Sequence, residues 1–136
     1  MSIASYTHTI ATVLGLVCAM VSACLMLNLK TADRRLKRGR IARRISPFTW
    51  IAFIALIISG VFLALDNHNL NIYILVAKHL LVIVLLVDAL LIHFRYFPRF
   101  FIQLGSPEFD KTYTVMRRIG ALSVSCWIDT CAFGPA

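Results

Sequence analysis

Four long runs of apolar residues follow one another along the chain, and short polar or basic stretches separate them. The runs cover about residues 8–29, 47–65, 72–94 and 119–133. As helices, the first three would each be roughly 30 Å long, which is the thickness of the hydrocarbon core of a bilayer. The fourth is shorter, and we expect it to tilt little or to end among the outer headgroups. The pattern therefore predicts an all-α protein, a bundle of four transmembrane helices.

The composition is typical of a membrane protein. Of the 136 residues 60% are hydrophobic, and the mean hydropathy is +0.81, whereas a soluble domain is nearer half apolar. No soluble domain or internal repeat is recognisable, so we expect residues 1–136 to form a single integral membrane domain. The formal net charge is +8, but the basic residues lie beside the apolar runs. We therefore expect the lipid bilayer, and no nucleic acid, as partner.

The basic residues indicate how the helices are oriented. Eight Lys and Arg residues lie within residues 30–44 and five within residues 95–118, whereas the polar link at 66–71 has none. By the positive-inside rule both basic stretches are cytoplasmic loops beside anionic headgroups, and both termini lie on the outer side. The membrane is expected to be the bacterial inner membrane. Pro47 is expected to open the second helix, and Pro98 to break the chain after the third.

The third apolar run carries four ionisable residues, Lys78, His79, Asp88 and His93. Each ionisable group in hydrocarbon costs on the order of 3 kcal/mol, so four of them in one run indicate a polar site that faces the bundle interior. Helical periodicity places His93 on the same face as His79, roughly 21 Å away, and Asp88 on the opposite face.

Some of these residues are expected at the same depth in the membrane as polar residues of other helices. His8 begins the first helix at the outer side, and Lys78 and His79 lie roughly 10 Å below the outer end of the third helix. Asp129 lies at a similar depth in the fourth helix. We therefore expect these four residues in one layer of the bundle. Within it, Lys78 would form a structural ion pair with Asp129, or with Asp88, or would snorkel to the interface.

The histidines suggest a cofactor or metal site. Neutral imidazole is a good ligand for haem iron and for copper, so His8 and His79 are candidate metal ligands. His93 is a further candidate at the inner end, although His8 and His93 could instead be ordinary interfacial histidines. We expect His79 to lie deep, either coordinated or hydrogen-bonded to Asp129, Ser123 or a partner chain. The chain has no hydrolase or nucleotide-binding motif, so no catalytic residue is assigned.

Three stretches resemble the CopD/HemJ-like group of small membrane proteins. Residues 43–65, RRISPFTWIAFIALIISGVFLAL, are similar to the second helix of that group, which has a basic start, a Ser and a small residue before Gly. Residues 77–100, AKHLLVIVLLVDALLIHFRYFPRF, are similar to its Ala-Lys helix, which ends in a His-x-Arg…Pro-Arg turn. His8 stands where the group usually has a histidine at the start of the first helix.

The resemblance implies a four-helix membrane bundle associated with copper uptake, or with haem binding and protoporphyrinogen oxidation. His8, Lys78 and His93 match positions of the group's motifs, whereas His79 is not part of its pattern. Two features depart from the group: the Trp-x-Gly-Gly of the first helix is absent, and Met20 stands near the place of a basic residue. Both departures count against protoporphyrinogen oxidase activity.

We therefore expect an integral membrane protein that binds haem b, or alternatively copper, for redox chemistry or metal handling. Two other functions stay open at this point. The chain could be a non-catalytic subunit of a larger membrane complex, or a homo-oligomer, in which buried polar groups bond to neighbouring subunits. It could also be a small ion or proton transporter with Lys78, Asp88 and Asp129 as its relay.

Overall fold

A computed structural model describes residues 2–66 and 71–132 of the chain. Within these ranges the structure is helical and has no strand. The helices are α1 (Ile3–Leu25), α2 (Ala32–Asp66), α3 (Ile72–Leu90), the π-helical η1 (Leu91–Tyr96), α4 (Phe97–Ile102) and α5 (Phe109–Ala132). Because η1 joins α3 to α4 without a break, the described chain forms four helical rods. The predicted all-α fold is confirmed.

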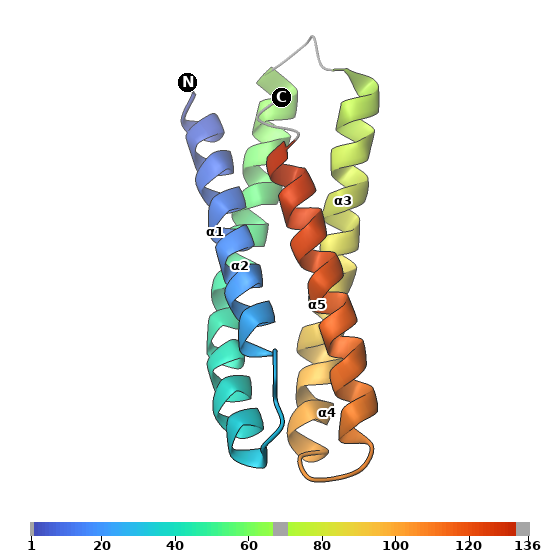
Figure 1. Cartoon of the computed structure of the whole chain (residues 1–136). Coiled ribbons are helices and arrows are strands. Elements are labelled where there is room, and N and C mark those ends of the chain that lie inside the picture. The colour runs from blue at the N-terminus through green and yellow to red at the C-terminus, as the bar shows by residue number, and fades with distance from the viewer. Residues whose placement is uncertain (1, 67–70, 133–136) are drawn as a thin grey trace.

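The four rods lie side by side and run alternately in opposite directions (Figure 1). α1 packs along α2, and α5 packs against both α1 and α3. The start of α1 and the end of α5 lie at one end of the bundle, whereas the loop between α1 and α2 and the turn before α5 lie at the other. We name this second end, formed by residues 26–44 and 95–118, the basic end.

Three of the rods are long and apolar enough to cross a membrane: Ile3–Leu25, Ala32–Asp66 and Ile72–Ile102. Their outward faces carry large exposed apolar side chains, among them Ile10, Ile51 and Leu80. Contiguous apolar surface of this kind is unfavourable in water but is well matched to lipid. The structure therefore agrees with the prediction that the chain is integral to a membrane.

The second rod is longer than the sequence predicts. α2 begins at Ala32, so the prediction that Pro47 opens this helix is wrong, and Pro47 lies inside it. A proline inside a helix costs about 3 kcal/mol, because it removes a hydrogen bond and its ring crowds the preceding turn. Packing at the basic end offsets this cost. Ala42 is 1% exposed, and Gly39 lies so close to the ring of Phe100 that a Cβ there would come within 2.5 Å of it.

The third rod also continues past its predicted end, and Pro98 does not break it. Just before this proline, η1 forms a wider turn in which the backbone N–H of Phe97 donates to the carbonyl of Ile92, five residues earlier. The wider turn moves the preceding carbonyls away from the Pro98 ring. Pro98 follows this wider turn directly, at the start of α4, and the rod continues past it to Ile102.

The first and fourth rods also differ from their predicted bounds. α1 begins at Ile3 rather than near residue 8, because the Ser2 hydroxyl accepts a hydrogen bond from the backbone N–H of Ser5 and caps the helix. α5 begins at Phe109 rather than at residue 119, and its predicted end at residue 133 lies outside the described residues. Hydropathy marks only the part of a helix that lipid would cover, and not its continuation into water.

Two buried clusters hold the rods together. The first surrounds Trp127 of α5 and includes Ala11 of α1, Phe53 and Leu56 of α2 and Leu85 of α3, so all four rods meet in it. The second lies at the basic end and consists of Met26, Leu29, Ala42, Phe97, Phe100, Phe109 and Met116. Burying each large apolar side chain of such a cluster contributes about 1.5–3 kcal/mol.

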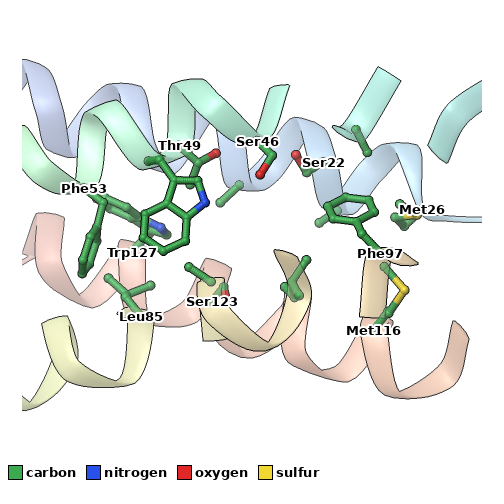
Figure 2. Close-up of a pocket in the computed structure, with 17 residues that line it drawn as sticks. Ser22, Met26, Ser46, Thr49, Phe53, Leu85, Phe97, Met116, Ser123 and Trp127 are labelled. Atoms are coloured by element: carbon green, nitrogen blue, oxygen red, sulfur yellow. The ribbon is translucent and has the colours of Figure 1, made fainter. Parts of the chain in front are cut away.

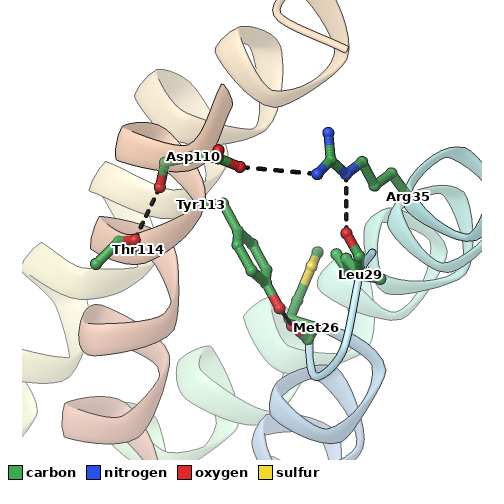
Figure 3. Close-up of polar contacts among 6 residues, drawn as sticks. All are labelled: Met26, Leu29, Arg35, Asp110, Tyr113 and Thr114. Atoms are coloured by element: carbon green, nitrogen blue, oxygen red, sulfur yellow. Dashed lines mark hydrogen bonds and ion pairs between the residues drawn. The ribbon is translucent and has the colours of Figure 1, made fainter. Parts of the chain in front are cut away.

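At the basic end, Arg35 of α2 joins the loop after α1 to the start of α5 (Figure 3). Its Nε donates a hydrogen bond of 2.8 Å to the backbone carbonyl of Leu29, and its guanidinium lies 4.1 Å from the centre of the Phe109 ring. The ion pair of Arg35 with Asp110 is 3.7 Å long, and Asp110 is 81% exposed. An exposed pair contributes little to stability, so the contacts with Leu29 and Phe109 are the more important ones.

Tyr113 of α5 provides a second connection to the same loop (Figure 3). Its hydroxyl donates to the backbone carbonyl of Met26, the residue that follows α1. Two residues later Asn28 has a φ of 54°, in the left-handed region that asparagine tolerates better than most residues. The loop that reverses the chain between α1 and α2 is thus held by side chains from both α2 and α5.

Candidate functional site

A pocket of about 120 Å³ lies between the rods, toward the end of the bundle opposite the basic end. Three of its polar lining residues are His8 of α1 and Lys78 and His79 of α3, and we name it the histidine pocket. The rest of its lining is Leu56, Ile57, Gly60, Val61, Leu63, Ala64, Leu75, Val82 and Thr130. The structure therefore brings together three of the four residues that the sequence predicts in one layer.

His8 is held against α2 by a serine that the sequence does not single out as its partner. The Nδ1 of His8 lies 3.1 Å from Oγ of Ser59. That hydroxyl has one hydrogen, and it donates to the carbonyl of Ala55 at 2.6 Å. Because the Ser59 oxygen can then only accept from His8, the imidazole carries its hydrogen on Nδ1. In this tautomer the lone pair of His8 is on Nε2.

His79 also carries its hydrogen on Nδ1, because of a hydrogen bond within its own helix. Its Nδ1 lies 2.7 Å from the backbone carbonyl of Leu75, which can only accept, so the hydrogen is again on Nδ1. Within the described ranges, neither Ser123 nor Asp129 hydrogen-bonds to His79, so of the predicted alternatives coordination and a bond to a partner chain stay predictions. His79 is exposed rather than enclosed by the rods, and its depth in the membrane also stays a prediction. The backbone carbonyl one turn earlier accepts the Nδ1 hydrogen of the histidine, whichever way that face of the helix points.

In both imidazoles, Nε2 is the nitrogen that remains for metal binding. A histidine whose Nδ1–H is bound to a carbonyl or hydroxyl has its Nε2 oriented and made more basic, which is the usual arrangement of a metal-binding histidine. Among residues 2–66 and 71–132, however, no group of three or more His, Cys, Asp or Glu side chains is placed to hold a metal ion. What the described chain shows is one pocket lined by two imidazoles and by Lys78.

A second cavity, also of about 120 Å³, lies between the histidine pocket and the basic end (Figure 2). Hydroxyl groups reach it from three rods: Ser22 of α1, Ser46 and Thr49 of α2, and Ser123 of α5, and we name it the hydroxyl cavity. The remaining lining residues are Ala19, Ala23, Met26, Ala42, Trp50, Phe53, Leu85, Ala89, Ile92, Phe97, Met116, Gly120 and Trp127. The two cavities share no lining residue.

His93, a predicted site residue, lies beside the hydroxyl cavity and not in the histidine pocket. Its Nδ1 is 3.0 Å from Oγ of Ser46, and its ring packs edge-on against Trp50 and Phe94. The wider turn of η1 carries His93 and presents it to α2. His79 and His93 thus lie at separate cavities.

The two acidic residues of the predicted site lie in different environments, one buried and one exposed. Asp88 is 5% exposed, and its Oδ2 accepts a hydrogen bond of 3.0 Å from Ser123 of α5. Asp129 is exposed on α5, next to the pocket-lining Thr130. The ion pair of Lys78 with either acid stays a prediction.

The sequence does not identify the serines that bond to the two histidines. Ser59 bonds to His8, and Ser46 bonds to His93. A serine in a long apolar run is a weak signal, because it also fits between helices as a small residue. Only the arrangement of the rods shows which serine faces which histidine.

Comparison of the chain with protein-family models, with curated proteins and with solved structures finds no match. The resemblance to the CopD/HemJ-like group therefore stays a prediction, and the function has to be argued from the two cavities.

Proposed function

We propose that the chain is an integral membrane protein that binds copper, or haem b, in the histidine pocket for metal handling or redox chemistry. The observation that carries the proposal is the pair His8 and His79. They come from two different rods, line one pocket, and each has its Nδ1 hydrogen-bonded so that Nε2 is left as a ligand. Two such nitrogen atoms beside an apolar wall suit a soft or borderline metal ion.

The size of the pocket favours copper over haem. A pocket for a drug-sized ligand measures roughly 300–1,000 Å³, whereas the histidine pocket measures about 120 Å³. A metal ion fits this volume and a haem does not, so haem b would bind only if α2 and α3 moved apart. Bound copper would supply one-electron redox chemistry or would be the cargo of the site.

Lys78 is the observation that favours haem. An ammonium group in the pocket lining repels a metal cation but attracts the carboxylates of a haem. In the copper case, Lys78 would instead lower the affinity of the pair and favour release of the ion. This role would suit a protein that passes copper on rather than one that stores it.

The test is to purify the protein in detergent, measure bound copper, and record its reduced-minus-oxidised absorption spectrum. Under the proposal, His8→Ala and His79→Ala each lose the metal or the haem bands, while the protein remains in the membrane. His93→Ala is the matched control, because His93 lies at the other cavity. A protein without stoichiometric copper or haem contradicts the proposal. Loss of the cofactor in His93→Ala alone would place the site at the hydroxyl cavity instead.

The proposal includes the membrane arrangement of the chain. We infer that α5 crosses the bilayer with the three longer rods, so that residues 1–136 form one domain with both termini on the outer side. Thirteen of the fourteen Lys and Arg residues lie in stretches 30–44 and 95–118, which supports a cytoplasmic basic end in a bacterial inner membrane, beside anionic headgroups. A reporter fused after residue 136 should lie on the outer side of the membrane. A signal from the cytoplasm would refute this topology.

A second candidate function is a subunit of a larger membrane complex or homo-oligomer. The observation in its favour is α3, which packs on α5 and leaves large apolar side chains such as Tyr73, Leu80 and Val87 exposed. A metal-free protein that purifies with larger subunits, or as an oligomer of itself, would support this candidate over the copper site.

A further inference from the structure

The hydroxyl cavity connects two titratable groups that the cofactor site does not use. Ser46, on its α2 wall, lies 3.0 Å from the imidazole of His93. Ser123, on its α5 wall, donates a hydrogen bond of 3.0 Å to the carboxyl group of Asp88. Figure 2 shows both serines at the cavity, on opposite walls. The cavity therefore lies between a histidine near the basic end and an acid in the middle of the bundle.

The cavity has the properties that ordered water requires. Its volume is about 120 Å³, whereas one water molecule occupies roughly 30 Å³ in the liquid. Ser22 and Thr49 add two further hydroxyl groups to the cavity lining, so several water molecules would each find polar partners. A chain of hydroxyl groups and water of this kind conducts protons, because each member can accept one hydrogen and donate another.

Asp88 is the group that such a chain would serve. It is 5% exposed, on a rod that is otherwise apolar at this depth. Ionisable residues inside membrane spans are costly, and they commonly mark proton or ion pathways. A carboxyl group buried this deeply exchanges its proton only if hydrogen-bonding groups lead to it. Ser123 is the group that leads from Asp88 to the cavity wall.

An apolar cluster bounds the hydroxyl cavity at each end. Toward the histidine pocket, the lining residues Phe53, Leu85 and Trp127 belong to the cluster where the four rods meet, and toward the basic end, Met26, Ala42, Phe97 and Met116 belong to the second buried cluster. Between the two clusters, Ser46 lies beside His93, which is partly exposed and two residues from the basic end. His93 and Ser46 therefore give a proton a polar route to the cavity that avoids both apolar clusters.

We propose that the hydroxyl cavity is a proton path by which Asp88 exchanges protons with the aqueous phase at the basic end through His93. In the inward step, the imidazolium of His93 loses a proton to Ser46 and water. Ser123 passes its hydroxyl proton to Asp88 and takes a proton from the cavity water, so an O–H bond forms on the carboxylate and the serine hydroxyl is restored. No electron moves, and the charge lost by the imidazolium neutralises the carboxylate. The path is distinct from the copper or haem site and rests only on the inference that the bundle spans a membrane.

Two thiols and one acid on the neighbouring rods are further titratable groups of the bundle. Cys18 of α1 and Cys126 of α5 are buried, and Asp129 is exposed one turn beyond Cys126. Neither thiol lines the hydroxyl cavity. The experiment therefore has to distinguish Asp88 from Asp129 and has to apply the pH change from one side at a time.

The test uses dicyclohexylcarbodiimide, which dissolves in the bilayer and modifies a carboxyl group only when that group is protonated. The full chain is reconstituted in sealed vesicles, and its orientation is read from the reaction of the exposed Lys111 with an amine reagent that does not cross the membrane. The pH is then changed on one side, and modification of Asp88 is followed by mass spectrometry of its peptide.

Modification should slow, by up to about tenfold per unit, as the pH rises at the basic end, and should not respond to the pH at the opposite end. Asp88→Asn should abolish it and Asp129→Asn should not. If the rate follows the pH of the opposite end, or of neither end, or if Asp129 is the modified residue, the proposal is overturned. The Lys111 reaction is scored separately, so a failure of the membrane topology is distinguishable from a failure of the path.

Two variants test the cavity itself. Ser46→Leu fills the space and removes the hydroxyl beside His93, so modification of Asp88 should lose its response to pH at the basic end. Thr49→Val preserves shape while removing one hydroxyl, and should slow the response after a pH jump. The matched control is Ser125→Leu on the exposed face of α5, which should behave like the original chain. An unchanged response in both cavity variants would contradict the path.

Discussion

The contact between Gly15 and Trp127 makes a sharp prediction about the packing of α1 on α5. Trp127 is 2% exposed and lies directly over Gly15. A Cβ added at Gly15 would lie 2.2 Å from Cη2 of the indole and 2.5 Å from its Cζ2. Ordinary carbon–carbon contacts are about 3.5–4.0 Å, so Gly15→Ala forces the two helices, or the indole, to separate by more than about 1 Å.

The indole shares a buried cluster with Ala11, Phe53, Leu56 and Leu85, and it borders the hydroxyl cavity, so any relief has to come from a shift toward that cavity. Overpacking of this kind costs about 1–3 kcal/mol. Replacing a helical glycine by alanine contributes about 0.5–1 kcal/mol in the opposite direction. The steric term is the larger one, so we expect a net loss of about 1–2 kcal/mol, which for a chain of this size lowers the Tm by about 3–8 °C.

The assay is thermal unfolding in detergent, followed with a thiol-reactive fluorescent dye. Cys18 and Cys126 are 8% and 5% exposed, so their thiols react only when the bundle opens. Gly120→Ala is the matched control, because nothing lies within 4 Å of a Cβ at that position. We expect it to leave the Tm unchanged or raise it slightly.

A second substitution shows whether the indole is the cause. In a chain that already carries Trp127→Leu, the added methyl group of Gly15→Ala meets a smaller side chain, and its cost should largely disappear. Such non-additivity is expected of residues in direct contact. If Gly15→Ala raised the Tm, or cost the same with and without the indole, the close packing of α1 on α5 would be wrong.

Two further predictions concern the basic end, and both use the same unfolding assay. Phe100→Ala removes a ring that is 0% exposed and should cost about 3–5 kcal/mol, whereas Phe94→Ala on the exposed surface should have little effect; equal losses would contradict the second buried cluster. Tyr113→Phe removes the hydrogen bond to the Met26 carbonyl and should cost about 1–2 kcal/mol. Tyr73→Phe, at an exposed position, serves as its control, and an unchanged Tm in Tyr113→Phe would show that the loop does not depend on this bond.

The sequence predicts the four rods well, because a bilayer imposes a minimum length of apolar chain that is visible without any tertiary information. It does not predict where the rods end. The basic stretch before Pro47 is helical because Gly39 and Ala42 pack against the third rod, including Phe100, and that contact joins residues far apart in the sequence. Pro98 is accommodated by a wider turn that no local pattern announces.

For the candidate site, depth proves more predictable than direction. Counting residues from the ends of the rods places His8, Lys78 and His79 in one layer, and the histidine pocket contains all three. The azimuth of a residue identifies the face it occupies but not the helix that covers that face. For this reason the sequence does not show that Ser123 serves Asp88, or that His79 bonds to its own helix.

Pro47 divides α2 into two stiff arms. Because proline has no N–H, one backbone hydrogen bond is absent at this point and bending of the helix concentrates there. The arm beyond Pro47 is roughly 29 Å long, so a bend of about 5° would displace its end by roughly 2.5 Å. Ser46 and Thr49 line the hydroxyl cavity on either side of the proline, whereas Ser59 lies well along one arm. Flexing of α2 would therefore widen or narrow the hydroxyl cavity while Ser59 moves as part of a single rigid piece.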